Sequence, residues 1–261
     1  MREVGILAVG CVTPLGEHPP SLWAALCAGV TTLSPQPNLA ALIDPRAAVV
    51  PGPDLTRWLA RRKDLRLLPR AARLALPAAG RAMEGYDGDR EELGIYVAIG
   101  REPPDEGECE PALAAMENHR HLDLTRLGNE GRALYPPLLP LRTLPNMVLA
   151  HVAIQHGIRG ENGTYAGGAA AGRQALEEGV RAVVEGRAPF ALVGAAYSGV
   201  DLASARDRLR MGDPDPPGEA AIFALIGPGG RPVPQGSVDR RWRVALGDVG
   251  PVEGMLGLLE G

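Results

Sequence analysis

Short apolar runs alternate along this chain with stretches that carry apolar residues at helical spacing. Most of the short runs are bounded by glycine, proline or charged residues, which is typical of buried β-strands. The pattern predicts strands at 4–9, 93–99, 164–166, 190–195, 220–226 and 242–246.

The intervening stretches predict helices. They fall between Ser21 and Gly29, at 55–83, 113–132, 146–156 and 173–185. Pro69 and Pro77 interrupt the stretch 55–83, so two helices are expected there. The segments 34–53 and 102–111 are rich in proline or acidic residues and predict loops, whereas Leu134 to Met147 is an irregular stretch of prolines and leucines. Strands alternating with helices predict an α/β fold with a largely parallel, buried sheet.

A glycine-rich turn follows the strand predicted at 164–166. It reads Gly167-Gly168-Ala169-Ala170-Ala171-Gly172 and leads directly into a helix. The spacing is not the Gly-x-Gly-x-x-Gly of dinucleotide-binding loops, and no acidic residue ends a strand about twenty residues on. Small residues at this place instead favour close packing of the helix on the sheet.

The segment 144–172 resembles the stretch around the nucleophile of β-ketoacyl synthases. Residues 160–172 fit without gaps on that family's pattern Gly-Pro-Asn-Tyr-Thr-Val-Ser-Thr-Ala-Cys-Ala-Ser-Gly, and the nucleophilic cysteine falls on Ala169. Residues 9–16, 186–194 and 218–221 resemble further elements of the family, in the family's order. The resemblance therefore covers residues 2 to about 227.

This resemblance implies a thiolase-like α/β fold, as a truncated ketosynthase with most of its C-terminal half missing. We expect a single ketosynthase-like domain over 1–261, with the N-terminal half intact over 1–227 and a residual segment over 228–261. A shortened domain exposes surface that the missing half covers in the family. The isolated chain is therefore expected to be poorly soluble or to self-associate.

The departures from the family pattern indicate that the chain has no catalytic residue of its own. Ketosynthases carry the acyl chain on the cysteine and use two downstream histidines. Alanine cannot form a thioester, and every histidine of this chain precedes Ala169: His18, His119, His121, His151 and His156. His151 and His156 lie five residues apart, which does not place them on one helix face for a metal, so no metal site is expected.

The resemblance extends to the chain-length factor of type II polyketide synthases, which is a ketosynthase relative without the nucleophile. Within that group the chain resembles the shortened form found in highly reducing, polyene-forming systems. It implies a heterodimer with an active ketosynthase, paired along the strand before the nucleophile position: Asn162, Gly163, Thr164, Tyr165 and Ala166. It also implies an acyl tunnel at the interface, for which we expect lining by Leu138, Leu141 and Met147. No cofactor is expected in this chain, because the phosphopantetheine-bound acyl chain reaches the partner ketosynthase. Acyl carrier protein is therefore expected to be an indirect partner, through the ketosynthase.

Composition narrows the remaining functions. The net charge of −4 comes from basic and acidic residues mixed along the sequence, so no nucleic-acid surface is predicted. Three cysteines without close spacing, Cys11, Cys27 and Cys109, argue against disulfides or zinc and favour a cytoplasmic protein. Neither a signal peptide nor an apolar run of membrane-spanning length is present in the sequence given.

Two alternatives to a chain-length factor stay open from the sequence. One is a homodimeric scaffold or binding protein, and the other is a hydrolase or acyltransferase that uses Ser198 or Ser204 with Asp201. The arginines between Arg206 and Arg210 are expected either to form a solvated loop or to receive an acidic carrier protein. Cys11 is expected to be a small buried apolar residue rather than a reactive thiol.

Overall fold

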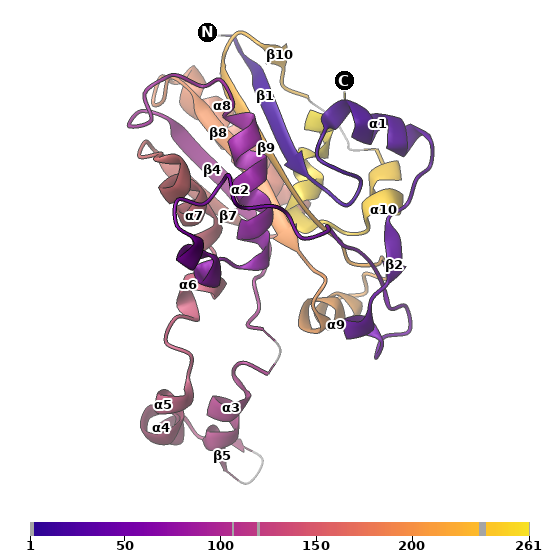
Figure 1. The fold of residues 1–261 in the computed structure, drawn as a ribbon, viewed down its shortest axis with the longest axis vertical. Helices are drawn as coiled ribbons and strands as arrows, with labels where there is room; N and C mark the ends of the chain where they lie inside the picture. The colour runs from indigo at the N-terminus through magenta and orange to yellow at the C-terminus, as the bar shows by residue number, and fades with distance from the viewer. Residues whose placement is uncertain (1–2, 106, 119–120, 235–238, 261) are drawn as a thin grey trace.

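A computed structural model of the protein describes residues 3–105, 107–118, 121–234 and 239–260. Its main sheet is built from β1 (Val4–Val12), β4 (Gly94–Ile99), β7 (Asn162–Ala166), β8 (Ala191–Ser198), β9 (Glu219–Pro228) and β10 (Arg231–Pro232). Within the described residues these six strands take the order β10-β1-β9-β8-β4-β7 (Figure 1). The strand β7 therefore forms one edge of the sheet.

The sheet is mixed rather than largely parallel, so that part of the sequence prediction is wrong. β4 pairs in parallel with β7 and β8, whereas β9 runs antiparallel to both β8 and β1. The chain leaves β8 and passes through α9 (Leu202–Arg210), which lies at the end of the sheet (Figure 1). It re-enters the sheet from the end at which it left, and the next strand must therefore run the opposite way.

One face of the sheet is covered by α2 (Arg70–Ala82) and α7 (Met147–His156). α2 lies so close to β1 that a Cβ built on Gly10 would come within 2.0 Å of the Ala78 carbonyl oxygen. The helix runs through Pro77, contrary to the break expected there, because one proline removes only one backbone hydrogen bond. Gly157, with a φ of 70°, ends α7 in the left-handed conformation, as predicted.

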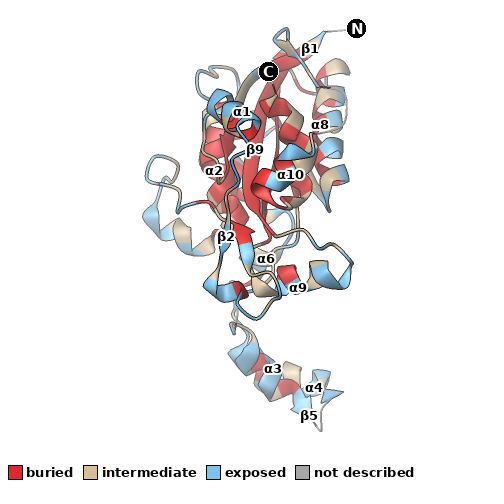
Figure 2. Ribbon diagram, turned by 90° about the vertical axis from the view of Figure 1, so that its right-hand side faces the viewer, coloured by how far each residue is buried: buried red, intermediate tan, exposed pale blue. Residues whose placement is uncertain are grey.

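The opposite face is covered by α8 (Ala169–Val184) and by the C-terminal part of the chain, α10 (Arg241–Leu246) and η4 (Gly250–Leu259). α1 (Pro19–Cys27) packs beside them. Figure 2 shows α2 on one side of the buried strands and α8 on the other. The strand predicted at 242–246 is wrong: Trp242, Ala245 and Leu246 are buried on one helical face, a spacing of three and four residues.

The C-terminal segment supplies much of the core on the α8 side. Trp242, Val252, Met255, Leu256 and Leu259 are all buried in the hydrophobic cluster on this face. The side of α8 that carries its charged residues faces solvent. The C-terminal segment therefore covers this face of the sheet, while the poor solubility or self-association expected of the isolated chain stays a prediction.

Between β4 and α7 the chain forms an arm that projects from the body (Figures 1 and 2). Its elements are α3 (Glu110–Met116), β5 (Glu117–Asn118), β6 (His121–Leu122), α4 (Leu124–Arg126), η3 (Leu127–Gly131), α5 (Arg132–Leu134) and, at its base, α6 (Pro140–Thr143). The single helix expected over 113–132 is wrong. Asp123 starts a new helix inside that range by accepting hydrogen bonds from the backbone N–H groups of Thr125 and Arg126.

The segment 34–53, expected as loop, contains a short hairpin. Its elements are β2 (Leu33–Pro35), η1 (Pro37–Leu39) and β3 (Arg46–Ala48), and η2 (Arg62–Leu67) precedes α2. Among the described residues, none of the helices combines the length and apolar character that crossing a bilayer requires.

Candidate functional site

Ala169 is the first residue of α8, directly after a sharp turn at the end of β7. Gly167 takes a φ of 150° and donates its N–H to the Ile99 carbonyl oxygen, so the turn is tied to the neighbouring strand. The Ala169 side chain is half-buried. A helix N-terminus stabilises a thiolate placed there, but a methyl group cannot use that field.

The C-terminal segment lies directly over the first turns of α8. A Cβ built on Gly172 would come within 2.0 Å of the Pro251 carbonyl oxygen, and one on Gly254 within 2.3 Å of the Ala169 carbonyl oxygen. Only glycine allows backbones to approach this closely. Position 169 is therefore bordered by η4.

The edge strand β7 presents one row of unpaired backbone groups. Glu161 accepts a hydrogen bond from the Ile95 N–H and Gly167 donates one to Ile99, so the odd-numbered residues of this stretch bond to β4. In a parallel pair the intervening residues direct their N–H and C=O groups the other way. Asn162, Thr164 and Ala166 therefore point these groups outward, where no described strand pairs with them.

The described histidines do not gather near Ala169. His151 is buried in α7 and His156 lies 3.4 Å from the Leu76 carbonyl oxygen of α2, on the opposite face of the sheet. Burial lowers the pKa of both. His18 and His121 are exposed, and His119 lies outside the described residues. The described residues contain no group of three or more His, Cys, Asp or Glu side chains that could hold a metal.

The family model of the β-ketoacyl synthase N-terminal domain matches residues 1–223 of this chain. The chain belongs to the β-ketoacyl synthase family. Among curated proteins, none matches it.

Solved ketosynthase structures share the fold at low sequence identity. The ishigamide ketosynthase/chain length factor is 24% identical, with a TM-score of 0.62 over 86% of this chain and 62% of that chain. A β-ketoacyl synthase from Burkholderia phymatum STM815 is 20% identical, with a TM-score of 0.65 over 88% and 60%. The structure of a type II polyketide acyl-carrier protein in complex with its ketosynthase bound to the hexaketide matches at 15% identity. Its TM-score is 0.65 over 87% of this chain and 63% of that chain. The ketosynthase-like chain thus spans about 60% of the length of these neighbours.

The three residues expected to line an acyl tunnel lie around the base of the arm. Leu138 is 54% exposed, and Leu141 and Met147 are half-buried, in α6 and at the start of α7. Their neighbours Leu139 and Thr143 line a polar cavity at the end of the sheet. The tunnel assignment therefore stays a prediction.

The serines considered for a hydrolase have no catalytic arrangement. The Ser198 hydroxyl donates a hydrogen bond of 2.8 Å to Glu219 Oε2, and the Asp201 carboxylate accepts one from the Ser204 backbone N–H. Asp201 therefore starts α9 and does not orient a base. No described histidine contacts either serine.

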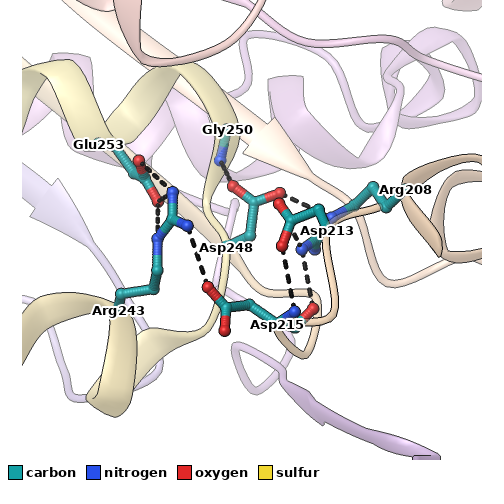
Figure 3. Close-up of polar contacts among 7 residues, drawn as sticks. All are labelled: Arg208, Asp213, Asp215, Arg243, Asp248, Gly250 and Glu253. Atoms are coloured by element: carbon teal, nitrogen blue, oxygen red, sulfur yellow. Dashed lines mark hydrogen bonds and ion pairs between the residues drawn. The ribbon is translucent and has the colours of Figure 1, made fainter. Parts of the chain in front are cut away.

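The arginines between Arg206 and Arg210 divide into two groups. Arg208 is almost buried and forms ion pairs with Asp213 at 3.1 Å and Asp248 at 2.9 Å (Figure 3). Arg206 and Arg210 stay exposed. One of the three arginines therefore has a structural role.

A second ion-pair group beside it fixes the C-terminal segment. Arg243 of α10 bonds to Glu253 of η4 and to Asp215 in the loop before β9, at 2.8 and 3.0 Å (Figure 3). Asp248 also accepts a hydrogen bond of 2.8 Å from the Gly250 N–H. These contacts tie η4 to α10, and α10 to the loop before β9.

Residues 218–221 resemble a family element in sequence, but the sequence predicts no role for the carboxylate of Glu219. Glu219 is fully buried and accepts hydrogen bonds from Arg70, the Ser198 hydroxyl and the Val50 N–H. It joins β9, β8 and α2 at the end of the sheet. Its arginine partner lies 149 residues away, so only the folded structure shows the pair.

Proposed function

We propose that this chain is a non-catalytic partner of an active ketosynthase, of the chain-length-factor type, in a polyene-forming type II polyketide system. The observation that carries the proposal is the tight turn after β7 that leads into α8, because the first residue of α8 is Ala169, which aligns with the family's cysteine in sequence. A chain without a nucleophile contributes by completing the site of another subunit.

The free edge of β7 is the surface by which we propose that the two subunits pair. The outward N–H and C=O groups of Asn162, Thr164 and Ala166 would bond to the matching strand of the partner and join the two sheets. An exposed sheet edge is otherwise a hazard for aggregation, which a partner removes.

The arm supplies apolar surface that a partner would cover. Seven of its large apolar side chains are exposed: Leu113, Leu122, Leu124, Leu134, Tyr135, Leu138 and Leu144. Clustered exposure of this kind marks interaction surfaces. In the proposed complex Leu138, Leu141 and Met147 limit the length of the acyl chain, which stays attached to the partner.

The pairing is tested by co-expression with the ketosynthase encoded nearest to this chain. We expect a one-to-one complex by gel filtration that elongates malonyl units loaded on carrier protein. Thr164→Pro removes only an outward N–H, so the fold tolerates it and the complex is lost, whereas Thr164→Val keeps it. An unaltered complex with Thr164→Pro would rule out this edge.

The length-limiting role is tested separately in the same assay. Leu138→Trp and Met147→Trp fill the proposed tunnel, where overpacking costs roughly 1 to 3 kcal/mol, and the products should become shorter. Full ketosynthase activity without this chain would contradict the proposal. The free edge also fits a second copy of this chain; a dimer formed by the chain alone and broken by Thr164→Pro would favour that homodimeric function.

A further inference from the structure

A cavity of about 380 Å³ opens at the end of the sheet where β4 and β8 finish and β9 begins. Its lining is strongly charged, in contrast to the apolar core above it. The charged groups that face it come from α2, the β4–arm junction, α6, the start of α9 and β9: Arg70, Arg73, Glu102, Asp105, Arg142, Asp201 and Glu219.

Glu102 is the group in this cavity without a partner. The residue as a whole is half-buried, but its Oε1 atom is shielded from solvent and no described residue forms a hydrogen bond with it. Burial, with the nearby charges of Asp201 and Glu219, raises the pKa of Glu102 to about 8. The side chain therefore holds its proton at neutral pH, and an unpaired buried polar group calls for an explanation.

The cations around the cavity are already engaged elsewhere. Arg70 bonds to the Glu219 carboxylate, with an Nε to Oε2 distance of 3.0 Å. Arg142 pairs with Asp105 at 2.7 Å and also with Glu108. Neither guanidinium group pairs with Glu102, although a positive charge beside Glu102 would stabilise its ionised carboxylate.

Arg73 is occupied as well, by hydrogen bonds to backbone carbonyl groups. Its Nε donates to the Leu68 carbonyl oxygen at 3.1 Å, and its Nη2 to that of Leu65 at 3.5 Å. The electrostatic influences on Glu102 thus come from two carboxylates and no arginine. The site therefore lacks a cationic group that pairs with the Glu102 carboxylate.

We propose that the cavity binds a small organic cation whose ammonium or guanidinium group pairs with the carboxylate of Glu102. Apolar walls from Val49, Leu68, Leu139 and Val200 would contact a short aliphatic part of the same molecule. On binding, the Glu102 carboxyl group gives its proton to solvent and the resulting carboxylate accepts hydrogen bonds from the ligand cation. This inference goes beyond the pairing with a ketosynthase and does not depend on it.

Calorimetric titration of the purified chain at pH 7 tests the proposal with 1-butylamine and 1-butylguanidine. Butan-1-ol and butyrate serve as matched probes without the positive charge. We expect at least one of the two cations to bind and neither control to do so. Measurements in two buffers of different ionisation enthalpy should show release of about 0.9 proton per bound cation, as a pKa of about 8 requires.

The variant Glu102→Gln has the shape of the protonated side chain and keeps the fold. It should lose at least tenfold in affinity and release no proton, whereas the control Glu84→Gln, an exposed acid that pairs with Arg57, should bind as the wild type does. Equal binding of butyrate or butan-1-ol, no binding of either cation, or unchanged affinity in Glu102→Gln would each overturn the proposal. Complex formation through β7 is measured independently, so the two proposals can fail separately.

Discussion

The C-terminal segment is expected to contribute a large share of the folding free energy, and Trp242→Ala tests this directly. Trp242 is 1% exposed, packs beside Trp23 with ring centroids 6.3 Å apart, and donates its indole N–H to Glu260 at 2.9 Å. Truncation of such a side chain costs about 3 to 5 kcal/mol. Because a domain is stable by only about 5 to 15 kcal/mol, this is a large fraction of the total.

The assay is urea unfolding followed by circular dichroism, with Val244→Ala as the matched control. Val244 lies on the same short helix but is 68% exposed, so its truncation should change stability by no more than about 0.5 kcal/mol. The midpoint for Trp242→Ala should therefore fall well below those of wild type and control. Equal midpoints for the two variants would refute the view that α10 and η4 complete the core.

Three further predictions follow from local geometry. Gly172→Ala places a methyl group against a backbone carbonyl of η4 and should destabilise the chain by about 1 to 3 kcal/mol in the same assay, whereas Gly168→Ala meets nothing within 4 Å and should be nearly neutral. Burial raises the pKa of Cys11 to about 12, so a thiol reagent at pH 8 should modify exposed Cys27 in the native protein and Cys11 only after unfolding; modification of both at equal rates would contradict this. The folded pKa of Glu102, about 8, lies above its unfolded value of about 4.5, so its contribution to stability is full below pH 4.5 and declines as the pH rises to 8. Over that range the free energy of unfolding of the wild type should fall, relative to that of Glu102→Gln, by up to about 1.4 kcal/mol per pH unit. If the two free energies of unfolding changed with pH in parallel, the burial of the Glu102 carboxyl group would be contradicted.

The sequence predicts those elements whose signals are local. Gly157 ends α7 where a left-handed residue is needed, and the apolar runs that become β4, β8 and β9 are buried along most of their length. Each of these features depends on neighbouring residues only. The family assignment also follows from sequence, because the residues around Ala169 keep the family's spacing.

The remaining features depend on contacts between distant residues. The direction of β9 depends on α9 lying at the end of the sheet, which the strand-helix alternation does not encode. The segment at 242–246 fits a strand or a helix equally well, and only its packing beside α1, where Trp242 lies against Trp23, decides between them. Glu102 lies in a stretch predicted as exposed loop, yet the ends of β8 and β9 bury its carboxyl group.

The surroundings of Ala169 bear on the proposed non-catalytic role. Ala169 begins α8 directly after a tight turn, the described histidines of α7 lie across the sheet from it, and His18 and His121 are exposed. A cysteine at position 169 would gain the field of the helix N-terminus, but among the described residues no histidine lies beside that position to act as a base. We therefore propose that the chain contacts a partner through the surfaces left open in the described structure, which are the unpaired edge of β7 and the exposed apolar side chains of the arm.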